Sequence, residues 1–394
     1  MKSSRQLPTQ PHRDAWVEIN LGALERNARR LRAALPSQTN LMAVVKADAY
    51  GHGAVMVLPV LQAAGFSMAG VASVDEAVQL REAGVELPIL VLGGVPDWSM
   101  EAAVEYDLRL TVFTPEHLEG LMRLYRRTQR PVRVHVKVDT GMNRVGVSPT
   151  DALKLIEQCQ QTPAVVLEGI FSHLASPNDA PVLQQQWTRW QSVLRQVSAL
   201  PPCIHLANSS GAFALKDLTT AALAEASNPP PIPSTMVRIG LSLFGYNETQ
   251  PAPILLEAVM GLKARIVHVH EVPAGEGVSY GHRYHTQRPS RIATLPLGYA
   301  DGIPRCLSNR IDGLLRGVAV PQVGTITMDQ LMLDVTDVPE VRPGEAVTLL
   351  GSETTASGQR LERSLSGWAT LANTIEYELM CGLRVRLPRT YTRL

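Results

Sequence analysis

No apolar run in the sequence is long enough to cross a bilayer, so the sequence predicts no membrane helix. Neither sign of charge is in excess, since 37 Lys and Arg residues stand against 36 Asp and Glu residues. This balance and the lack of a basic block argue against nucleic acid and favour a small-molecule partner. Residues 1–14 lack the apolar stretch of a secretory signal, so we expect a disordered tail and a cytoplasmic protein.

Cysteine is scarce, and its four positions are far apart in the chain: Cys159, Cys203, Cys306 and Cys381. None belongs to a CxxC pair, and no histidine set with the spacing of zinc ligands lies nearby. We therefore expect small buried side chains at these positions and no metal site.

Short β-branched runs alternate with longer helical stretches from about residue 41 to about residue 240. Such repeated βα units are typical of α/β folds. Eight strands are predicted, at Leu41–Lys46, Ser67–Ala72, Pro88–Leu92, Arg109–Phe113, Val132–Val138, Val165–Phe171, Cys203–Leu206 and Met236–Leu241. This count fits a (β/α)8 barrel of the TIM type. After the second of these strands, Ser73 and Glu76 predict a capping box at the start of a helix.

After Pro251 the sequence changes to strand-like runs separated by Gly and Pro turns, with little helix. The runs are Ala264–His270, Arg291–Pro296, Val318–Val323, Leu331–Val335 and Ala346–Leu350. We expect a barrel domain over residues 15–250 and a C-terminal mainly-β domain over residues 251–394. One strand at residues 15–19 is left over from the count of eight and is a candidate partner for the second domain.

The segment VVKADAYGHG, residues 44–53, carries the first candidate for chemistry. In it an apolar strand ends in Lys46 and opens into a turn with two glycines. Catalytic residues of barrels lie at the carboxyl ends of the strands. Burial there would lower the pKa of the lysine and favour the neutral amine, which forms a Schiff base with an aldehyde. A lysine that only extends from a strand end to solvent is the alternative.

This segment resembles the motif to which the alanine racemase family attaches pyridoxal 5'-phosphate (PLP). The resemblance runs from residue 15 to about residue 391. Its further blocks in the barrel are VHVKVDTGMNR (134–144), SH (172–173), HLANSSG (205–211) and RIGL (238–241). Each block follows or ends a predicted strand, so all should meet at one mouth of the barrel. The resemblance implies an enzyme that interconverts L-alanine and D-alanine and supplies D-alanine for peptidoglycan.

The resemblance also implies which residues are catalytic. Racemisation needs a base on each face of the substrate Cα, because a proton leaves one face and returns on the other. Lys46 serves one face and Tyr280 the other. The implied cofactor-binding residues are Lys46, Tyr50, His173, Ser209, Arg238, Gly240, Leu241 and Tyr377. Ser209, at a predicted helix start, and the backbone at residues 240–241 offer the hydroxyl and N–H donors that a phosphate needs.

Arg238 restricts the type of PLP reaction that the resemblance implies. By resemblance it faces the pyridine nitrogen of PLP, where many PLP enzymes have a carboxylate. A guanidinium cannot accept the ring proton, so the ring should stay neutral and transamination should be disfavoured. By the same resemblance His173, with Arg238 behind it, is the neighbour expected to lower the pKa of Tyr280. A strand arginine in a structural ion pair is the alternative.

In the resembled family the active sites of a homodimer are shared between subunits. Tyr280 then comes from the partner subunit, together with Met328 and Asp329. Arg144 matches the arginine that binds the substrate carboxylate, and Lys137 matches a lysine that is carbamylated in the family. A carbamate would turn this cation into an anion that orients Arg144.

The segment LGYADG, residues 297–302, matches the channel through which substrate enters, with Tyr299 and Tyr377 as the inner gate and Arg305 further out.

Two positions depart from the family pattern. Thr327 stands where Cys or Ser is usual, and Asn178 stands where an acid is usual. An acid, Asp179, is found one position after the place where the family has it. This leaves open which residue pairs with Arg305.

Two alternatives have the same fold: a broader-specificity amino-acid racemase and a decarboxylase of the ornithine or diaminopimelate kind. A third is a non-catalytic PLP-binding protein related to the barrel alone. Arg238 and Tyr280 argue against decarboxylation. The β domain with Tyr280 argues against a carrier, which needs no second base. A broader racemase would differ in the size of its pocket.

Overall fold

The computed structural model describes residues 13–218, 232–247 and 254–393. The chain divides into two compact units, one of residues 24–49 and 54–257, the other of Met1–Ala23, Tyr50–Gly53 and Ala258–Leu394. The expected tail at residues 1–12 and the expected boundary near residue 250 lie outside the described residues. Within the described part of the expected tail, the Arg13 guanidinium pairs with Asp301 at 2.6 Å.

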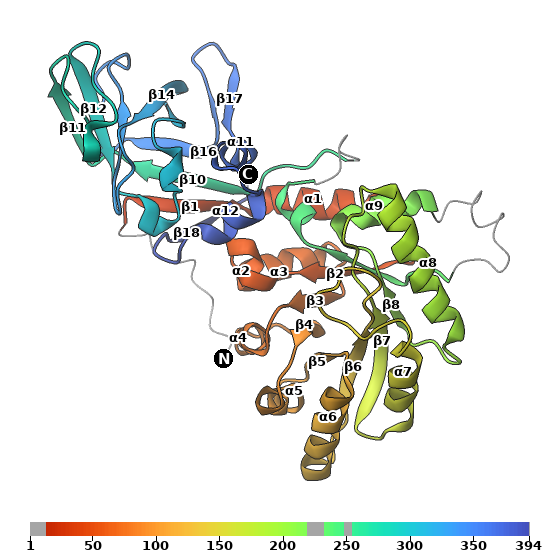
Figure 1. The fold of residues 1–394 in the computed structure, drawn as a ribbon. Helices are drawn as coiled ribbons and strands as arrows, with labels where there is room; N and C mark the ends of the chain where they lie inside the picture. Colours follow the sequence, from red (N-terminus) through yellow and green to blue (C-terminus); the bar gives the residue numbers. More distant parts are fainter. Residues whose placement is uncertain (1–12, 219–231, 248–253, 394) are drawn as a thin grey trace. The chain divides into compact units, whose positions relative to one another are not determined.

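Eight parallel strands form the sheet of the first unit, in the order β8-β7-β6-β5-β4-β3-β2-β9 (Figure 1). They are β2 (Asn40–Val44), β3 (Met68–Val71), β4 (Ile89–Gly94), β5 (Arg109–Val112), β6 (Val132–Lys137), β7 (Val165–Phe171), β8 (Cys203–His205) and β9 (Met236–Ile239). The predicted barrel strands are confirmed, and their ends differ from those of the structure by at most two residues.

The two end strands of this sheet, β8 and β9, meet and nearly close the barrel. Thr235 donates its backbone N–H to the carbonyl of Ile204 at 2.8 Å, and Arg238 donates to Ala207 at 3.1 Å. On the other side of β9, Arg238 is paired with Met42 of β2. The first and last strands of the unit are therefore neighbours, as barrel closure requires.

Helices follow most strands and lie outside them (Figure 1). They are α1 (Leu21–Ala34), α2 (Lys46–Gly51), α3 (Ala54–Ala63), α4 (Val74–Glu82), η1 (Asp97–Ser99), α5 (Glu101–Glu105), α6 (Pro115–Thr128), α7 (Ala152–Gln161), α8 (Ala180–Gln196), α9 (Ser209–Leu218) and η2 (Leu241–Phe244). Helix α6 shows why these segments are helical. Thr114 accepts a hydrogen bond from the N–H of His117, Pro115 starts the first turn, and one face buries Leu118, Leu121 and Leu124.

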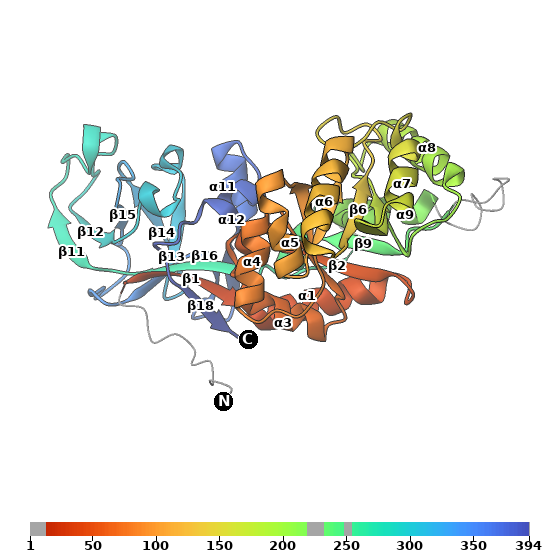
Figure 2. The same ribbon diagram turned by 90° about the horizontal axis from the view of Figure 1, so that it is seen from below.

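The second unit is built on a ten-stranded sheet, most of it antiparallel (Figure 2). Its strands are β1 (Ala15–Asn20), β10 (Met260–Arg265), β11 (His268–Val272), β12 (Ser290–Leu295), β13 (Asp312–Leu315), β14 (Val318–Val323), β15 (Leu331–Asp334), β16 (Ala346–Thr354), β17 (Arg360–Arg363) and β18 (Arg389–Thr392). The left-over N-terminal strand β1 pairs antiparallel with β10 and parallel with β18. Short helices complete the unit: η3 (Tyr280–His282), η4 (Tyr299–Asp301), η5 (Arg305–Leu307), α11 (Leu365–Ala372) and α12 (Glu376–Gly382).

Two expectations for this unit are wrong in detail. The single strand predicted at Ala264–His270 is two strands, because the backbone changes partner between them. Ile266 donates to Glu345, whereas Val267 donates to Thr294 of β12. Helices α11 and α12 were not predicted, although Ser364 caps α11 and Leu365, Trp368 and Ala369 have helical spacing.

The expectation that the four cysteines are buried is confirmed for only part of them. Cys159 is buried and Cys203 is half-buried, whereas Cys306 and Cys381 are exposed. Over residues 13–218, 232–247 and 254–393, the structure contains no group of His, Cys, Asp and Glu side chains arranged to hold a metal ion. No helix in this part of the chain is both long and apolar enough to span a membrane.

Candidate functional site

The carboxyl ends of the barrel strands bring together several of the predicted site residues. Lys46 follows β2, Lys137 ends β6, His173 follows β7, and Arg238 lies in β9. Burial lowers the pKa of His173, and the charges of Arg238, Lys137, Arg144 and Lys46 lower it further. Four basic side chains therefore lie near enough to act on one imidazole, and such a site suits an anionic ligand.

Arg238 is a buried cation whose guanidinium is held from several sides. Its Nη2 donates to the carbonyls of Ser172 (2.8 Å) and Leu206 (3.0 Å), and its Nη1 donates to the carbonyl of His205 (3.1 Å). Burial lowers the pKa of Arg238 to about 9, so the guanidinium still keeps its charge at neutral pH. The carbonyl oxygens offset part of the cost of burying that charge.

The same guanidinium determines the tautomer of His173. Nη2 of Arg238 lies 3.0 Å from Nδ1 of His173. Burial and the charge of Arg238 lower the pKa of His173 to about 2, so the imidazole is neutral. A guanidinium can only donate, so Nδ1 must accept and the proton lies on Nε2. His173 therefore offers one N–H donor at the mouth of the barrel.

A buried chain of hydrogen bonds runs from Arg238 to Glu168, and the sequence did not reveal it. Nη1 of Arg238 lies 2.9 Å from Nδ1 of His205, and Nε2 of His205 lies 2.9 Å from Nδ1 of His135. Nε2 of His135 lies 3.2 Å from the Glu168 carboxylate, which also pairs with Arg109. Burial lowers the pKa of both histidines, so both are neutral. Every bond then points from the guanidinium toward the carboxylate.

Local backbone geometry makes room for this chain of hydrogen bonds. In the β6–β7 pairing His135 is opposite Gly169 while Val134 is opposite Leu167, so Glu168 is the extra residue of a β-bulge. A Cβ on Gly169 would lie 2.3 Å from Nδ1 of His135. His135, which lies between two valines in β6, and Glu168, the one charged residue of β7, are the signal that could have identified this chain of hydrogen bonds.

Lys46 begins α2, whose backbone geometry is unusual; we call residues 47–50 the turn after Lys46. The φ angles of Ala47, Asp48, Ala49 and Tyr50 lie between 51° and 55°, in the left-handed region. Each such L-residue costs about 1–2 kcal/mol, and strain of this kind is concentrated at functional sites. The capping-box prediction is wrong in part here. Ser73 does cap α4, but the Glu76 carboxylate accepts from Ala47 and Ala72 instead.

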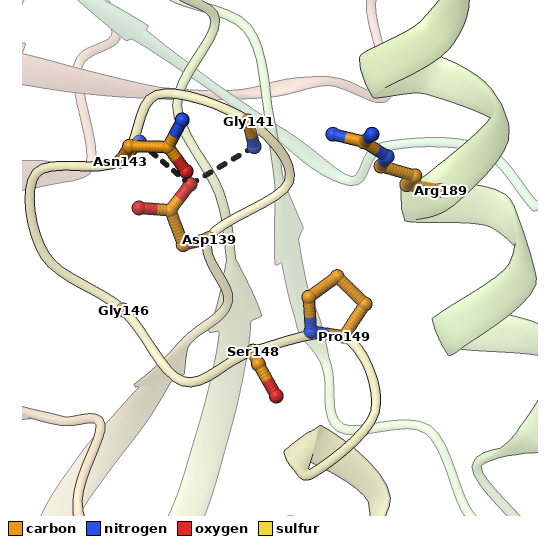
Figure 3. A pocket seen from close by; sticks show the side chains of 7 residues that line it. All are labelled: Asp139, Gly141, Asn143, Gly146, Ser148, Pro149 and Arg189. Atoms are coloured by element: carbon orange, nitrogen blue, oxygen red, sulfur yellow. Dashed lines mark hydrogen bonds between the residues drawn. The ribbon is translucent and has the colours of Figure 1, made fainter.

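Asp139 organises the loop that carries Arg144 (Figure 3). One carboxylate oxygen accepts from the backbone N–H groups of residues 141, 142 and 143, at 2.9–3.0 Å, and the other accepts from Arg144 at 3.1 Å. Burial alone would raise the pKa of Asp139, but these N–H groups lower it. A carboxylate fixed by four backbone donors gives the loop one conformation.

Lys137 is buried, and burial with the charge of Arg238 lowers its pKa to about 8. About a tenth of the amine is therefore neutral near pH 7, and the neutral amine is the form that a carbamate requires.

A hollow of about 340 Å³ adjoins this loop (Figure 3). Its lining residues are Asp139, Gly141, Asn143, Gly146, Ser148, Pro149 and Arg189. Lys46, His173 and Arg238 are not among the lining residues. Arg189 donates to the carbonyl of Thr140 at 3.2 Å and so holds the loop from the side of α8.

Ser209 and Gly240, two predicted phosphate ligands, are in contact. The N–H of Gly240 donates to the Ser209 hydroxyl at 3.0 Å, which links the start of α9 to the end of β9. Leu241 follows and starts η2. The N-terminus of a ten-residue helix thus lies beside a buried hydroxyl, a combination that suits phosphate.

The other predicted residues belong to the second unit. The rings of Tyr50 and Tyr377 lie 5.6 Å apart between centroids. Tyr280, Tyr299 and Met328 are exposed by 75%, 41% and 52%.

Hydrogen bonds tie the loops that carry these exposed side chains into one rigid cluster. The Thr325 hydroxyl donates to the carbonyl of Tyr280 at 2.8 Å, and Tyr299 donates its N–H to Thr327 at 3.0 Å. Asp329 pairs with Arg386 at 2.7 Å. We call this group of segments, 279–282, 298–302 and 325–330, the loop cluster.

The two departures have local explanations. The Thr327 hydroxyl accepts from the N–H of Gln330 at 3.1 Å, so this residue closes its own turn. Asp179 is the N-cap of α8 and accepts from the N–H of Val182. Asp179, the acid that follows Asn178, is thus used as a helix cap and does not replace Asn178, which is exposed. Arg305 is also exposed, at the start of η5.

Comparison with known proteins identifies the family. Residues 19–248 match the model "Alanine racemase, N-terminal domain", and residues 259–391 match "Alanine racemase, C-terminal domain". An alanine racemase from a Nostoc species is 40% identical over 389 residues, covering 95% of each chain.

Two solved structures are also similar. An alanine racemase from Bartonella henselae with covalently bound pyridoxal phosphate is 30% identical, with a TM-score of 0.81 over 96% of this chain and 99% of that one. A histidine racemase from Leuconostoc mesenteroides is 27% identical, with a TM-score of 0.86 over 98% and 99% of the two chains.

The buried neutral histidines should make the protein sensitive to acid. An unfolded histidine takes up a proton near pH 6.5, whereas folded His173 does not until about pH 2. Below about pH 6.5 only the unfolded state gains this proton, so the free energy of unfolding falls by up to about 1.4 kcal/mol per pH unit per histidine. We expect H173N to show a shallower fall than the unsubstituted protein between pH 6.5 and 5 in urea denaturation. Equal slopes would contradict the buried neutral state.

Proposed function

Because the chain belongs to the alanine racemase family and is an enzyme of that family, we propose that it interconverts L-alanine and D-alanine using PLP bound through Lys46. The observation that carries the proposal is the cation cluster at the barrel mouth, where Lys46 at a strand end lies among Arg238, Lys137 and Arg144 around the neutral His173. An amine for an aldehyde and positive charge for a phosphate and a substrate carboxylate are what such a reaction requires.

The residues present fit PLP. Ser209, Gly240 and Leu241 offer a hydroxyl and backbone N–H groups at one place, and Tyr50 and Tyr377 would add phenolic donors to the same phosphate. When bound, PLP withdraws electrons from the substrate and makes the Cα proton acidic.

Arg238 would face the pyridine nitrogen. Its charge survives burial, and in each of its side-chain hydrogen bonds the guanidinium is the donor. A permanent cation next to that nitrogen opposes its protonation and limits electron withdrawal by the ring. This supports proton exchange at Cα over transamination.

Two bases would move the proton. Lys46 would act on one face of Cα, and Tyr280 on the other. The Nε2–H of His173, oriented by Arg238, is a donor suited to stabilise a phenolate and so to lower the pKa of the tyrosine. Arg144, held by Asp139, would bind the substrate carboxylate. A carbamate on Lys137 would add an anion beside it.

We place Tyr280 in a homodimer whose subunits share their active sites. The loop cluster exposes Tyr280, Tyr299 and Met328 on a rigid backbone, and exposed apolar side chains of this kind mark interaction surfaces. A second copy would cover them, and Tyr280, Met328 and Asp329 would complete the partner's barrel mouth. Arg305 would lie at the outer end of the substrate channel and Tyr299 at its inner end.

The biological role that we propose is the supply of D-alanine for peptidoglycan. A broader or different amino-acid racemase is the second candidate, because the histidine racemase shares this fold over 98% of the chain. A non-catalytic PLP-binding barrel is disfavoured, since residues 259–391 match the C-terminal domain of the family.

Replacing Lys46 by alanine should remove covalent cofactor and activity. After borohydride reduction with PLP, mass spectrometry should find the pyridoxyl group on the Lys46 peptide of the unsubstituted protein and none in K46A. Racemase activity should fall by at least about a hundredfold. A reduced adduct on another lysine, with activity retained in K46A, would refute the assignment.

A mixing experiment tests the shared site. K46A and Y280F should each be inactive or nearly so as homodimers. If each site takes one base from each chain, a mixed dimer contains one complete site and one with neither base. Re-formed heterodimers should then regain up to about half of the original activity. No recovery in confirmed heterodimers would place both bases on one chain.

The substrate range separates the two candidate functions. A panel of L-amino acids that includes histidine should show the highest kcat/KM for alanine, measured as the formation of the D-enantiomer. A higher value for histidine or another bulky amino acid would favour the second candidate.

A further inference from the structure

We propose that Glu76 is a positioning residue that holds Lys46 in place through the backbone. The inference rests on the proposed function of Lys46. It concerns a side chain on the neighbouring βα unit, at the start of α4, that does not need to touch substrate or cofactor to act.

The turn after Lys46 needs external support. Four L-residues in succession, Ala47 to Tyr50, have left-handed φ angles, and such a backbone persists only where its surroundings hold it. The chain before the turn is held by the barrel, since Val45 donates to the carbonyl of Gly70 at 2.8 Å. Within the turn, Ala49 donates to Val45 at 2.8 Å.

Two side chains hold the turn itself. Asp48 accepts from the N–H of Ala54 at 2.7 Å and connects the turn to the start of α3. Glu76 accepts from the N–H of Ala47, the residue after Lys46, at 2.8 Å. The second oxygen of Glu76 accepts from the N–H of Ala72 at 2.7 Å, at the end of β3. One carboxylate thus joins the ends of two adjacent strands directly beside Lys46.

The site requires a carboxylate and not merely a polar side chain. Two N–H groups point at two oxygens, and an ionised carboxyl is an acceptor at both. The amide of a glutamine has one acceptor oxygen, and its NH2 group would face an N–H donor. Glu76→Gln therefore keeps the size of the side chain but loses one of the two bonds.

Loss of either bond breaks the link between the turn and the end of β3, which should let the left-handed turn relax and move Lys46. Reacting groups must be held to within a fraction of an ångström, and a shift of about 1 Å can cost about a hundredfold in rate. The effect should fall on steps that use the Lys46 amine and leave the binding of substrate elsewhere in the site largely unchanged.

The experiment compares E76Q with D75N in the full-length protein. Asp75 is exposed and precedes Glu76 in the first turn of α4, so D75N makes the same change of charge at the same helix end. The probe is PLP, added to protein from which cofactor has been removed, and the rate of covalent attachment is followed by borohydride trapping. Amide exchange of the peptide that contains residues 46–50 is measured in parallel.

We expect E76Q to attach PLP at least about tenfold more slowly than D75N, to exchange residues 46–50 faster, and to lower kcat for alanine with little change in KM. D75N should match the unsubstituted protein in all of these. Equal attachment rates and equal exchange in E76Q and D75N would overturn the role of Glu76.

Two further comparisons keep the outcome decisive. If the unsubstituted protein itself fails to attach PLP at Lys46, the proposed function fails, which differs from a failure of Glu76 alone. If E76Q does not fold, E76D provides the test, because it keeps the charge but cannot reach both N–H groups. E76D should then also attach PLP more slowly than D75N, and an equal rate would overturn the proposal.

Discussion

The buried charge of Arg238 is the constraint on which the barrel mouth depends. A cation removed from water costs several kcal/mol unless its donors are satisfied. The four N–H bonds of Nη1 and Nη2 are shared among the carbonyls of Ser172, His205 and Leu206 and two imidazoles. Because a guanidinium can only donate, it forces the tautomer of every ring that it contacts. Arg238 thus places the N–H of His173 on Nε2, at the mouth of the barrel, and directs the N–H of His205 toward His135.

The hydrogen bonds that run from Arg238 through His205 explain why polar residues lie where a barrel core would ordinarily be apolar. His205 and His135 carry the hydrogen-bond direction to Glu168, whose carboxylate supplies the opposite charge at a distance. The β-bulge at Glu168 and the glycine at position 169 provide the space. Direct contact between a carboxylate and Arg238 would cancel its charge at the mouth, whereas a chain of neutral histidines leaves the cation to act there.

The second set of constraints acts on the backbone. The strained turn after Lys46 and the loop that carries Arg144 are both held by carboxylates that accept backbone N–H groups, Glu76 and Asp48 in one case and Asp139 in the other. The loop cluster of the second unit is held mainly through backbone and hydroxyl contacts. In each case the side chain with proposed chemistry is separate from the residue that fixes its position.

The sequence by itself determined the eight barrel strands, the change to a β-rich second part, and the segments in which the candidate residues lie. These signals are local, since the alternation of strand and helix and the motif around Lys46 can be read without knowing which strands are neighbours. The break at Ile266 and Val267 was missed because both residues fit a strand, and only the change of hydrogen-bond partner separates β10 from β11. Tertiary structure alone decided that Glu76 reaches Ala47 and that Glu168 lies at the end of the hydrogen-bond chain from Arg238. Those contacts depend on strand order, a bulge and a left-handed turn, which bring together residues that are far apart in the sequence and that no periodicity relates.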